Sequence, residues 1–370
     1  MPLTLRAATR AVAGPGPGAD PGPGTGPSRV KQALLMLNQA EEDRISGESK
    51  SSSTSDMYSG LRYSLDAGSS RKNGDKNRYG NILSYDHALL PGPYLNASLI
   101  PPPKVVSSPL TAPSGRPPLR SYIASQAPLP TTFSTFFAHI CGNRVALLIN
   151  LAPLTEHGVP KADAYWPASG QTKRDVGDGW SISRSRPDER IGDEVPGEWD
   201  VVKRSLVIHA PAPVAAASAT SATGPTEEER HPRHQLTMLH VCSWADFGTS
   251  GKASFERLLS LIEDLNGQDH GSGPPLWLHC SAGVGRSGTV IAGLMARNLA
   301  RHGSLSAFSA AQGKERNGDS GPEEVAMHTA AKLVDHQRRY RPKMVQTPQQ
   351  LAMIVDAVSD CLCSPPSTGH

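Results

Sequence analysis

The most informative segment of the sequence is Leu276-Trp277-Leu278-His279-Cys280-Ser281-Ala282-Gly283-Val284-Gly285-Arg286-Ser287-Gly288-Thr289. It begins with an apolar run of strand length, and an apolar helical face follows it at Val290, Ile291 and Leu294. The glycines in between permit a tight loop that joins the strand to the helix. Such a loop can turn successive backbone N–H groups toward one point in front of a helix N-terminus. That arrangement binds a dianion such as phosphate.

Two side chains of this segment can act on a bound phosphate. The positive field of the loop favours the thiolate form of Cys280, which is a strong nucleophile. The planar guanidinium of Arg286 can hold two phosphate oxygens at once. A bare Cys-x5-Arg spacing arises readily by chance, but His279, the glycines, Ser287 and the strand–loop–helix setting make the pattern specific.

At this point the sequence resembles a known family. The segment from His279 to Thr289 matches the signature of protein tyrosine phosphatases at every fixed position. The resemblance implies that Cys280 is the nucleophile and that Arg286 binds the phosphate and the transition state. It also implies that Ser287 assists breakdown of the phosphocysteine and that His279 tunes and orients the loop. The residues implied to bind phosphate through their backbone are Ser281, Ala282, Gly283, Val284 and Gly285.

A second segment, Trp244-Ala245-Asp246-Phe247-Gly248, resembles the mobile Trp-Pro-Asp loop of the family, and Asp246 matches its general acid. A proton donor is needed because otherwise a high-energy phenolate would have to leave. Family members usually carry proline at the position of Ala245. Proline restricts the backbone, so alanine predicts a loop that closes less often and catalysis that is retained but slower.

The segment Lys76-Asn77-Arg78-Tyr79 resembles the loop that sets the depth of the family's substrate pocket. The resemblance implies that Tyr79 stacks on the phosphotyrosine ring and that Asn81 binds the substrate backbone. A deep aromatic wall lets phosphotyrosine reach the thiolate, whereas phosphoserine is too short to do so. Specificity for tyrosine is therefore expected.

Three further residues match supporting positions of the family. Gln346 matches the glutamine that positions the hydrolytic water, and Gln350 matches the second glutamine. Gln350 also has a structural explanation, because it completes a capping box with Thr347 at the start of a helix. Lys161 ends a segment that begins at Glu156 and resembles a loop supporting the phosphate loop. Ordinary surface charges are the alternative explanation there.

The predicted fold is a single α/β domain, with a twisted mixed β-sheet flanked by helices and the phosphate-binding loop between a strand and a helix. We predict that the catalytic domain covers residues 29–363, with a helical pattern beginning at Arg29. The segments predicted as a disordered tail, a low-complexity linker, two insertions and a C-terminal tail are 1–28, 46–72, 210–230, 303–322 and 364–370.

Apolar periodicity predicts the regular elements of the domain. Strands are expected at residues 94–100, 122–125, 145–151, 201–209 and 235–243. Helices are expected at residues 132–140, 254–265, 286–301, 323–338 and 348–360. The last two strands are expected to pair as a hairpin.

Composition limits the other functions that this chain of 370 residues could have. Its net charge of +3 is too small to indicate nucleic-acid binding, and no apolar run has the length of a membrane span. The 5 cysteines are scattered and odd in number, which indicates reduced thiols and a cytoplasmic location, with the nucleus as a second option. No metal or other cofactor is expected, because the loop amides and Arg286 supply the electrostatic stabilisation.

The expected partners are tyrosine-phosphorylated proteins, with protein kinases among them, and the chain is expected to be a monomer. Two other functions stay open from the sequence. Ala245 is the one feature that favours a pseudophosphatase, which would bind phosphotyrosine without hydrolysing it. A dual-specificity or lipid phosphatase would share the phosphate loop, but Tyr79 argues against it.

Overall fold

The fold comes from a computed structural model, which describes residues 27–47, 58, 60–104, 119–191, 199–211, 233–244, 251–267, 273–310 and 321–363. The predicted tail at 1–28 lies outside these residues except for its last two, which begin a helix. The C-terminal tail at 364–370 and nearly all of the predicted insertion at 210–230 also lie outside them.

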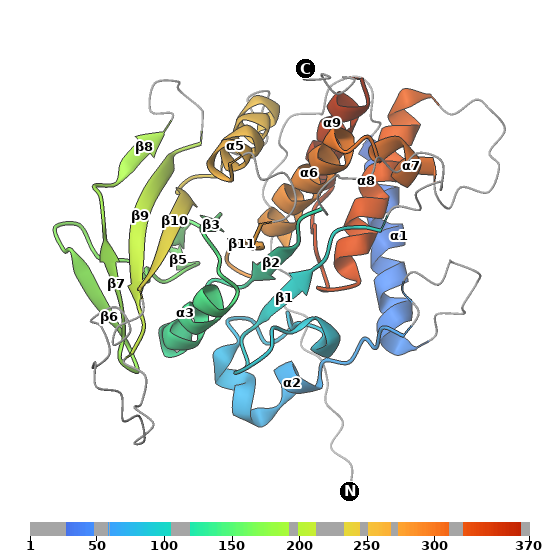
Figure 1. The fold of residues 1–370 in the computed structure, drawn as a ribbon. Helices are drawn as coiled ribbons and strands as arrows, with labels where there is room; N and C mark the ends of the chain where they lie inside the picture. Colours follow the sequence, from blue (N-terminus) through green and yellow to red (C-terminus); the bar gives the residue numbers. More distant parts are fainter. Residues whose placement is uncertain are drawn as a thin grey trace, which may run out of the picture.

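A twisted mixed β-sheet forms the centre of the fold (Figure 1). Its strands are β1 Ala97–Ile100, β2 Tyr122–Ser125, β3 Leu147–Asn150, β6 Lys173–Gly177, β7 Trp180–Arg184, β8 Glu189–Ile191, β9 Val201–His209, β10 Arg233–Val241 and β11 Leu276–His279. The strand order is β1-β2-β11-β3-β10-β9-β7-β6, and β8 pairs with β9. Strands β2, β11, β3 and β10 pair in parallel, and the other pairs are antiparallel. A separate hairpin consists of β4 Thr155–Glu156 and β5 Val159–Pro160.

Helices flank this sheet on both faces. They are α1 Pro27–Ser46, α2 Asp66–Ser69, α3 Phe133–Gly142, α5 Gly251–Leu265, α6 Gly285–Arg301, α7 Leu305–Ala310, α8 Pro322–Arg338 and α9 Pro348–Cys363, with 3-10 turns η2 Arg71–Lys76, η3 Asp86–Ala88 and η4 Pro130–Thr132. Helices α5, α6, α8 and α9 pack in one apolar cluster, and α3 packs in a second cluster on the opposite face. The prediction of a single α/β domain with a flanked mixed sheet is confirmed.

The central strand β11 shows why its sequence is an unbroken apolar run. Successive side chains of a strand point to opposite faces of the sheet. Leu276 and Leu278 therefore pack in the cluster of α5, α6 and α9, while Trp277 packs in the cluster of α3. Because both faces of this strand are covered, no position on it is left for a polar side chain until His279.

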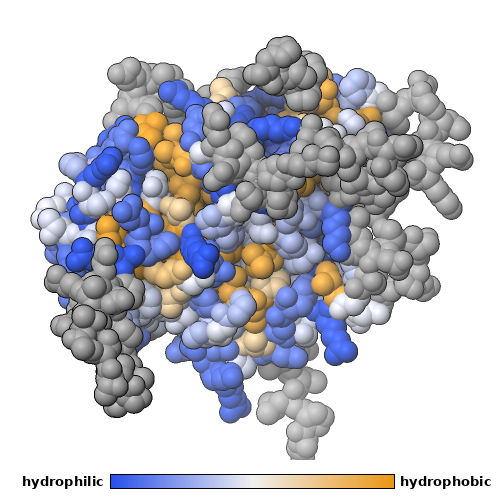
Figure 2. All heavy atoms as spheres, in the orientation of Figure 1, coloured by the Kyte–Doolittle hydropathy of each residue, from blue (hydrophilic) through white to orange (hydrophobic). Residues whose placement is uncertain are grey.

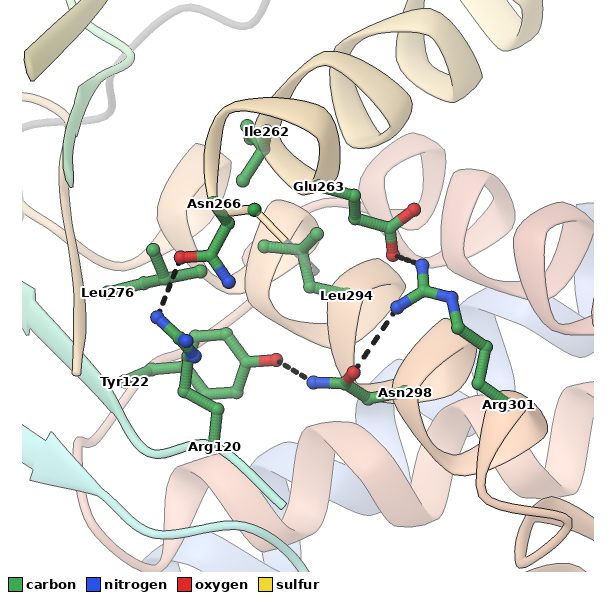
Figure 3. Close-up of a pocket in the computed structure, with 10 residues that line it drawn as sticks. Arg120, Tyr122, Ile262, Glu263, Asn266, Leu276, Leu294, Asn298 and Arg301 are labelled. Atoms are coloured by element: carbon green, nitrogen blue, oxygen red, sulfur yellow. Dashed lines mark hydrogen bonds and ion pairs between the residues drawn. The ribbon is translucent and has the colours of Figure 1, made fainter. Parts of the chain in front are cut away.

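Helix α5 follows the segment that contains Asp246, and a polar cluster ties this helix to the sheet (Figure 3). Arg120, just before β2, donates a hydrogen bond of 2.6 Å to the side-chain oxygen of Asn266 at the end of α5. On β2 itself, the Tyr122 hydroxyl accepts a hydrogen bond of 3.2 Å from Asn298 of α6. These contacts fix α5 and α6 on the same face of the sheet and so hold the C-terminal end of α5.

Two boundaries differ from the predictions. The predicted linker at 46–72 ends too late, because the chain is folded from residue 60 and the ring of Tyr63 packs edge-on against Tyr85, with centroids 5.1 Å apart. The predicted insertion at 303–322 contains helix α7, whose Leu305 and Phe308 are buried. A serine-rich or polar composition concealed these few anchoring side chains.

Candidate active site

The phosphate loop joins the carboxyl end of β11 to the first residue of α6, Gly285. Gly283 has a positive φ of 73° and lies so close to the backbone of Ser125 that a Cβ atom would collide with its carbonyl oxygen. A Cβ atom on Gly285 would lie 3.0 Å from the side-chain oxygen of Gln346 and 2.9 Å from the amide nitrogen of Gln350. Glycine is therefore required at Gly283, because backbone lies against it, whereas a side chain at Gly285 would displace the ends of Gln346 and Gln350.

Cys280 lies at the base of this loop and is 5% exposed. The N–H of Gly283 donates to its sulfur over 3.2 Å, so the thiol faces the inside of the loop. The N–H groups of Ser281, Ala282 and Val284 make no hydrogen bond to any described residue. With the free N–H groups of the first turn of α6, they form a niche that suits an oxyanion directly in front of the sulfur.

Arg286 lies in the first turn of α6, and three groups hold its guanidinium. It forms an ion pair with Glu156 on the β4–β5 hairpin and a long hydrogen bond of 3.5 Å to the carbonyl of Leu151. It also lies over the ring of Trp244, with 5.9 Å between its central carbon and the ring centroid. The Lys161 ammonium is 4.0 Å from the second oxygen of Glu156. The hairpin therefore brings both Glu156 and Lys161 to the phosphate loop.

His279 is fully buried and organises the loop from below. Burial lowers the pKa of His279 to about 3, so its ring is neutral near pH 7. Its Nδ1 is 3.2 Å from the carbonyl oxygen of Cys280, which can only accept, so Nδ1 carries the proton. Its Nε2 then accepts from the Tyr165 hydroxyl at 2.7 Å. The ring therefore fixes the peptide carbonyl of the cysteine.

Ser287, the residue after the arginine, is fully buried in the first turn of α6. Its hydroxyl has no hydrogen-bond partner among the described residues. A buried hydroxyl without a partner is costly, so such a group in a native fold calls for an explanation. The resemblance implies one, donation to a thiolate leaving group, and this role of Ser287 stays a prediction.

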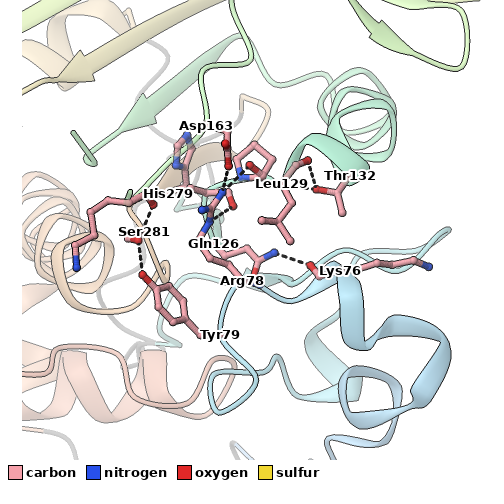
Figure 4. Close-up of polar contacts among 12 residues, drawn as sticks. Lys76, Arg78, Tyr79, Gln126, Leu129, Thr132, Asp163, His279 and Ser281 are labelled. Atoms are coloured by element: carbon pink, nitrogen blue, oxygen red, sulfur yellow. Dashed lines mark hydrogen bonds and ion pairs between the residues drawn. The ribbon is translucent and has the colours of Figure 1, made fainter. Parts of the chain in front are cut away.

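Tyr79 lies at the edge of the loop, as the resemblance implies (Figure 4). Its hydroxyl lies 2.7 Å from the Ser281 hydroxyl, which in turn donates to the carbonyl of Lys161 over 2.6 Å. Ser281 has only one proton, so Tyr79 is the donor in the first contact. The tyrosine ring is thereby fixed beside the phosphate niche, where it can form a side wall.

The segment that carries Tyr79 is held by the neighbouring Arg78 (Figure 4). The backbone N–H of Arg78 donates to Gln126 over 2.8 Å, and its guanidinium pairs with Asp163 at 2.6 Å. Gln126 in turn donates to the carbonyl of Lys76 over 2.7 Å. This network ties the wall of the pocket to the loop after β2, which carries the backbone that Gly283 touches.

The predicted capping box is present at the start of α9. The N–H of Gln350 donates to the Thr347 hydroxyl over 3.2 Å, and the Gln350 side-chain oxygen accepts from the N–H of Thr347 over 3.3 Å. The same oxygen accepts from the N–H of Gln346 over 2.8 Å. Gln350 therefore has the structural role, while the side chain of Gln346 is exposed beside Gly285. Asn81 is also exposed, and its carbonyl accepts from Lys343 over 2.9 Å.

Asp246 lies outside the described residues, as does Ala245. Trp244, directly before them, stacks on Trp199 with ring centroids 4.2 Å apart and an angle of 27° between the rings. Trp199 is also near Phe255 in the second turn of α5, with centroids 6.5 Å apart. Trp199 thus contacts the chain on both sides of the predicted acid loop. The sequence reasoning missed this residue.

Arg341 is a second residue that the sequence reasoning missed. It is fully buried beneath the loop and donates to the carbonyls of Gly283 and Ala282 over 2.8 and 3.0 Å. It also donates to Ser84 over 2.7 Å and to Asn96 over 3.0 Å. Burial lowers the pKa of Arg341 to about 10, and the Cys280 sulfur opposes that shift. Its positive charge therefore remains beneath the Cys280 sulfur near pH 7.

We predict that Arg341→Met lowers the free energy of unfolding by about 3 kcal/mol, because several buried acceptors lose their donor. Urea denaturation measures this change. The exposed Arg257 on α5 provides the control, since Arg257→Met is expected to alter the free energy of unfolding by less than about 0.5 kcal/mol. An equal effect of the two substitutions would contradict a bracing role for Arg341.

Two other classes of site are absent from the described part of the chain. It contains no cluster of at least three histidine, cysteine, aspartate or glutamate side chains that could hold a metal ion. None of its helices combines the length and the apolar character needed to cross a membrane.

Comparison with known families assigns the chain to one of them. The sequence model described as protein-tyrosine phosphatase matches residues 73–360. This match covers more than half of the chain, so the chain belongs to the protein-tyrosine phosphatase family.

Several relatives carry the same description. Tyrosine-protein phosphatase 3 of Dictyostelium discoideum is 28% identical over 300 residues, which cover 78% of this chain and 25% of that protein. Receptor-type tyrosine-protein phosphatase N2 of Mus musculus is 28% identical over 299 residues, which cover 78% and 24%. The chain thus spans about a quarter of the length of these relatives.

Solved structures show the same fold. The protein tyrosine phosphatase TbPTP1 of Trypanosoma brucei is 25% identical, with a TM-score of 0.60 over 91% of this chain and 92% of that one. The structure of PTPN18 in complex with HER2 phosphopeptides is 20% identical, with a TM-score of 0.60 over 90% and 93%. The second likeness concerns the fold alone.

Proposed function

We propose that this chain hydrolyses phosphotyrosine in proteins through a phosphocysteine intermediate. The observation that carries the proposal is the position of the Cys280 sulfur, which faces the N–H of Gly283 in a loop with further free N–H groups. Arg286 lies in the first turn of the following helix and can bind two phosphate oxygens. Membership of the protein-tyrosine phosphatase family supports this chemistry.

In the first proposed step, the Cys280 thiolate attacks phosphorus. The S–P bond forms while the bond to the tyrosine oxygen breaks, and Asp246 gives its proton to that oxygen. The loop N–H groups and Arg286 stabilise the charge on the three transferred oxygens. Tyrosine and a phosphocysteine are the products of this step.

In the second step, water attacks the phosphocysteine. Gln346 orients the water, and the Asp246 carboxylate takes its proton. The S–P bond breaks, inorganic phosphate is released, and Ser287 donates a hydrogen bond to the departing thiolate. No resident cofactor has a part in this scheme.

The position of Tyr79 favours phosphotyrosine over shorter substrates. Its ring is fixed at the edge of the niche by the hydrogen bond to Ser281, and the buried sulfur lies at the base of the loop. A long aromatic phosphoester can reach such a sulfur while its ring packs on Tyr79. Asn81, being exposed on the same segment, remains the proposed contact to the substrate backbone.

Matched phosphotyrosine and phosphoserine peptides test the proposal directly. We expect release of inorganic phosphate from the phosphotyrosine peptide and at least a hundredfold lower kcat/KM for the phosphoserine peptide. Equal rates on both peptides would indicate the dual-specificity alternative. Tight binding of the phosphotyrosine peptide without phosphate release would indicate the pseudophosphatase alternative.

The proposed partners are tyrosine-phosphorylated proteins, with protein kinases among them. PTPN18 has been solved with HER2 phosphopeptides, and the shared fold supports the same class of ligand here. The proposed location is cytoplasmic, with the nucleus as a second option, because the 5 cysteines are scattered and odd in number. Capture with Asp246→Ala, which should bind substrate without releasing it, would identify the partner.

Ala245→Pro is expected to raise kcat by about two- to fivefold, because proline reduces the conformational freedom of an open loop by about 0.4–1 kcal/mol. Steady-state hydrolysis of a phosphotyrosine peptide measures the change. Ala245→Gly is the control. Glycine increases the freedom of the backbone at the same position, so this variant should lower kcat. An unchanged kcat in Ala245→Pro would show that this position does not limit the loop.

A further inference from the structure

Helix α1 lies before the region that the family model matches, yet it contacts the segment between α8 and α9 that leads to Gln346. The contact is made by Glu41, a carboxylate that is only 6% exposed. Both of its oxygens accept from the backbone N–H of Lys343, over 3.1 and 2.9 Å. Arg338, the last residue of α8, lies 3.8 Å from the same carboxylate. Glu41 thus joins α1 to the segment between α8 and α9.

This segment has an unfavourable backbone conformation. Lys343 has a φ of 63° and Val345 a φ of 61°, although neither is glycine. Such conformations are unfavourable for residues other than glycine, and a β-branched residue such as Val345 rarely adopts them. The segment keeps this shape only if the surrounding structure holds it, and Glu41 is bonded to its first left-handed residue.

Arg338 holds the same segment from the other side. Its guanidinium donates to the carbonyls of Met344 and Val345 over 2.8 and 2.9 Å. It also donates to the side-chain oxygen of Asn38 on α1 over 2.8 Å. Helix α1 therefore supplies both Glu41 and Asn38 to the residues that fix this backbone.

The segment leads directly to the phosphate loop. The N–H of Val345 donates to the carbonyl of Val284 over 3.2 Å. Gln346 follows, and its side-chain oxygen lies 3.0 Å from the place where a Cβ atom of Gly285 would be. A continuous path of contacts therefore connects Glu41 to the proposed water-positioning glutamine.

We propose that Glu41 is a positioning residue for hydrolysis of the phosphocysteine, acting through the 343–345 backbone on Gln346. This inference rests on the proposed function, and it concerns chiefly the second step. The first step uses Cys280 and Arg286, which have their own supports in Arg341 and Glu156. Loss of Glu41 therefore affects the attack of water more than the attack of the thiolate.

The carboxylate has the properties that this role requires. Burial raises the pKa of Glu41, while the charge of Arg338 and the N–H of Lys343 lower it. Its two oxygens share the single N–H of Lys343 in a bifurcated hydrogen bond, and a negatively charged acceptor makes such a contact stronger than a neutral one. Its neighbour Glu42 is on the exposed side of the same helix.

Pre-steady-state hydrolysis of 4-nitrophenyl phosphate by Glu41→Ala tests the proposal. We expect the rate of the first 4-nitrophenol release to stay within about twofold of the unaltered protein. The steady-state kcat should fall tenfold or more, since small displacements of catalytic groups can cost up to about a hundredfold. The phosphoenzyme, trapped by acid quench, should accumulate to a higher fraction than in the unaltered protein.

Three further variants complete the experiment. Glu42→Ala is the matched control and should match the unaltered protein in both steps. Glu41→Gln keeps one acceptor oxygen and should give a smaller loss, which keeps the test usable if Glu41→Ala does not fold. In the Gln346→Ala background, Glu41→Ala should lower kcat by no more than about twofold further, because both act on the same water.

Two outcomes would overturn the proposal: an equal slowing of both steps, or a loss that adds fully to that of Gln346→Ala. Absence of any trapped phosphoenzyme in the unaltered protein and in every variant would instead contradict the phosphocysteine mechanism. The two failures are therefore distinguishable.

Discussion

Cys280→Ser is expected to lower kcat by a factor on the order of 10⁴ to 10⁶, the range observed when a covalent nucleophile is removed. A serine hydroxyl is not ionised near pH 7, so no anion is present to attack phosphorus. The loop N–H groups and Arg286 are unaltered, and the oxygen is smaller than the sulfur it replaces. Phosphotyrosine peptides should therefore still bind with a Kd within about tenfold of the original.

Hydrolysis of 4-nitrophenyl phosphate measures the loss, and calorimetric titration with a phosphotyrosine peptide measures the binding. Cys141→Ser is the matched control, because Cys141 is a half-buried thiol of α3 on the opposite face of the sheet. It should leave kcat within about twofold. Residual turnover above one per cent in Cys280→Ser would exclude this sulfur as the nucleophile.

Much of the central fold is predictable from local sequence. The run Leu276–Leu278 is apolar at every position because β11 is covered on both faces, and the helix after the loop has a clear apolar side. The hairpin of β9 and β10 and the capping box before α9 also follow from neighbouring residues alone. Because β11 and α6 are both recognisable from local sequence, the phosphate loop between these two elements could be located without a structure.

The strands at the far edge of the sheet were not predicted. Strand β6 is mostly polar and exposed, and β8 has three residues with no buried side chain. Their pairing depends on the long strand β9, against which β7 and β8 both lie. An edge that is stabilised by a distant partner leaves little periodicity in its own sequence.

The residues that brace the site are hidden for a similar reason. Arg341 and Glu41 are charged side chains in polar segments, and sequence patterns of this kind usually indicate an exposed surface. Their burial follows from contacts to residues far away in the chain, such as Gly283 for Arg341 and Lys343 for Glu41. Only the assembled fold shows that Arg341 faces the back of the phosphate loop and that Glu41 holds the segment beside it.

Arg286→Lys is expected to lower kcat/KM by a factor on the order of 10³, although the positive charge is retained. A lysine ammonium is a point charge and cannot hold two oxygens in one plane, as the guanidinium can. Removal of a single oxyanion donor typically costs a factor of about 10² to 10³. The ion pair with Glu156 and the contact with Trp244 would weaken at the same time.

The experiment compares this variant with Arg297→Lys, the same substitution further along the same helix α6. Arg297 pairs with Glu256 and Glu263 on α5, away from the phosphate loop. Arg297→Lys is therefore expected to keep kcat/KM within about threefold of the unaltered protein. Inhibition by inorganic phosphate provides a second measurement, and its inhibition constant should rise at least tenfold in Arg286→Lys alone. If the two variants were equally active, charge without the planar fork would be enough, and the geometry of the guanidinium would have no special part in binding the transferred group.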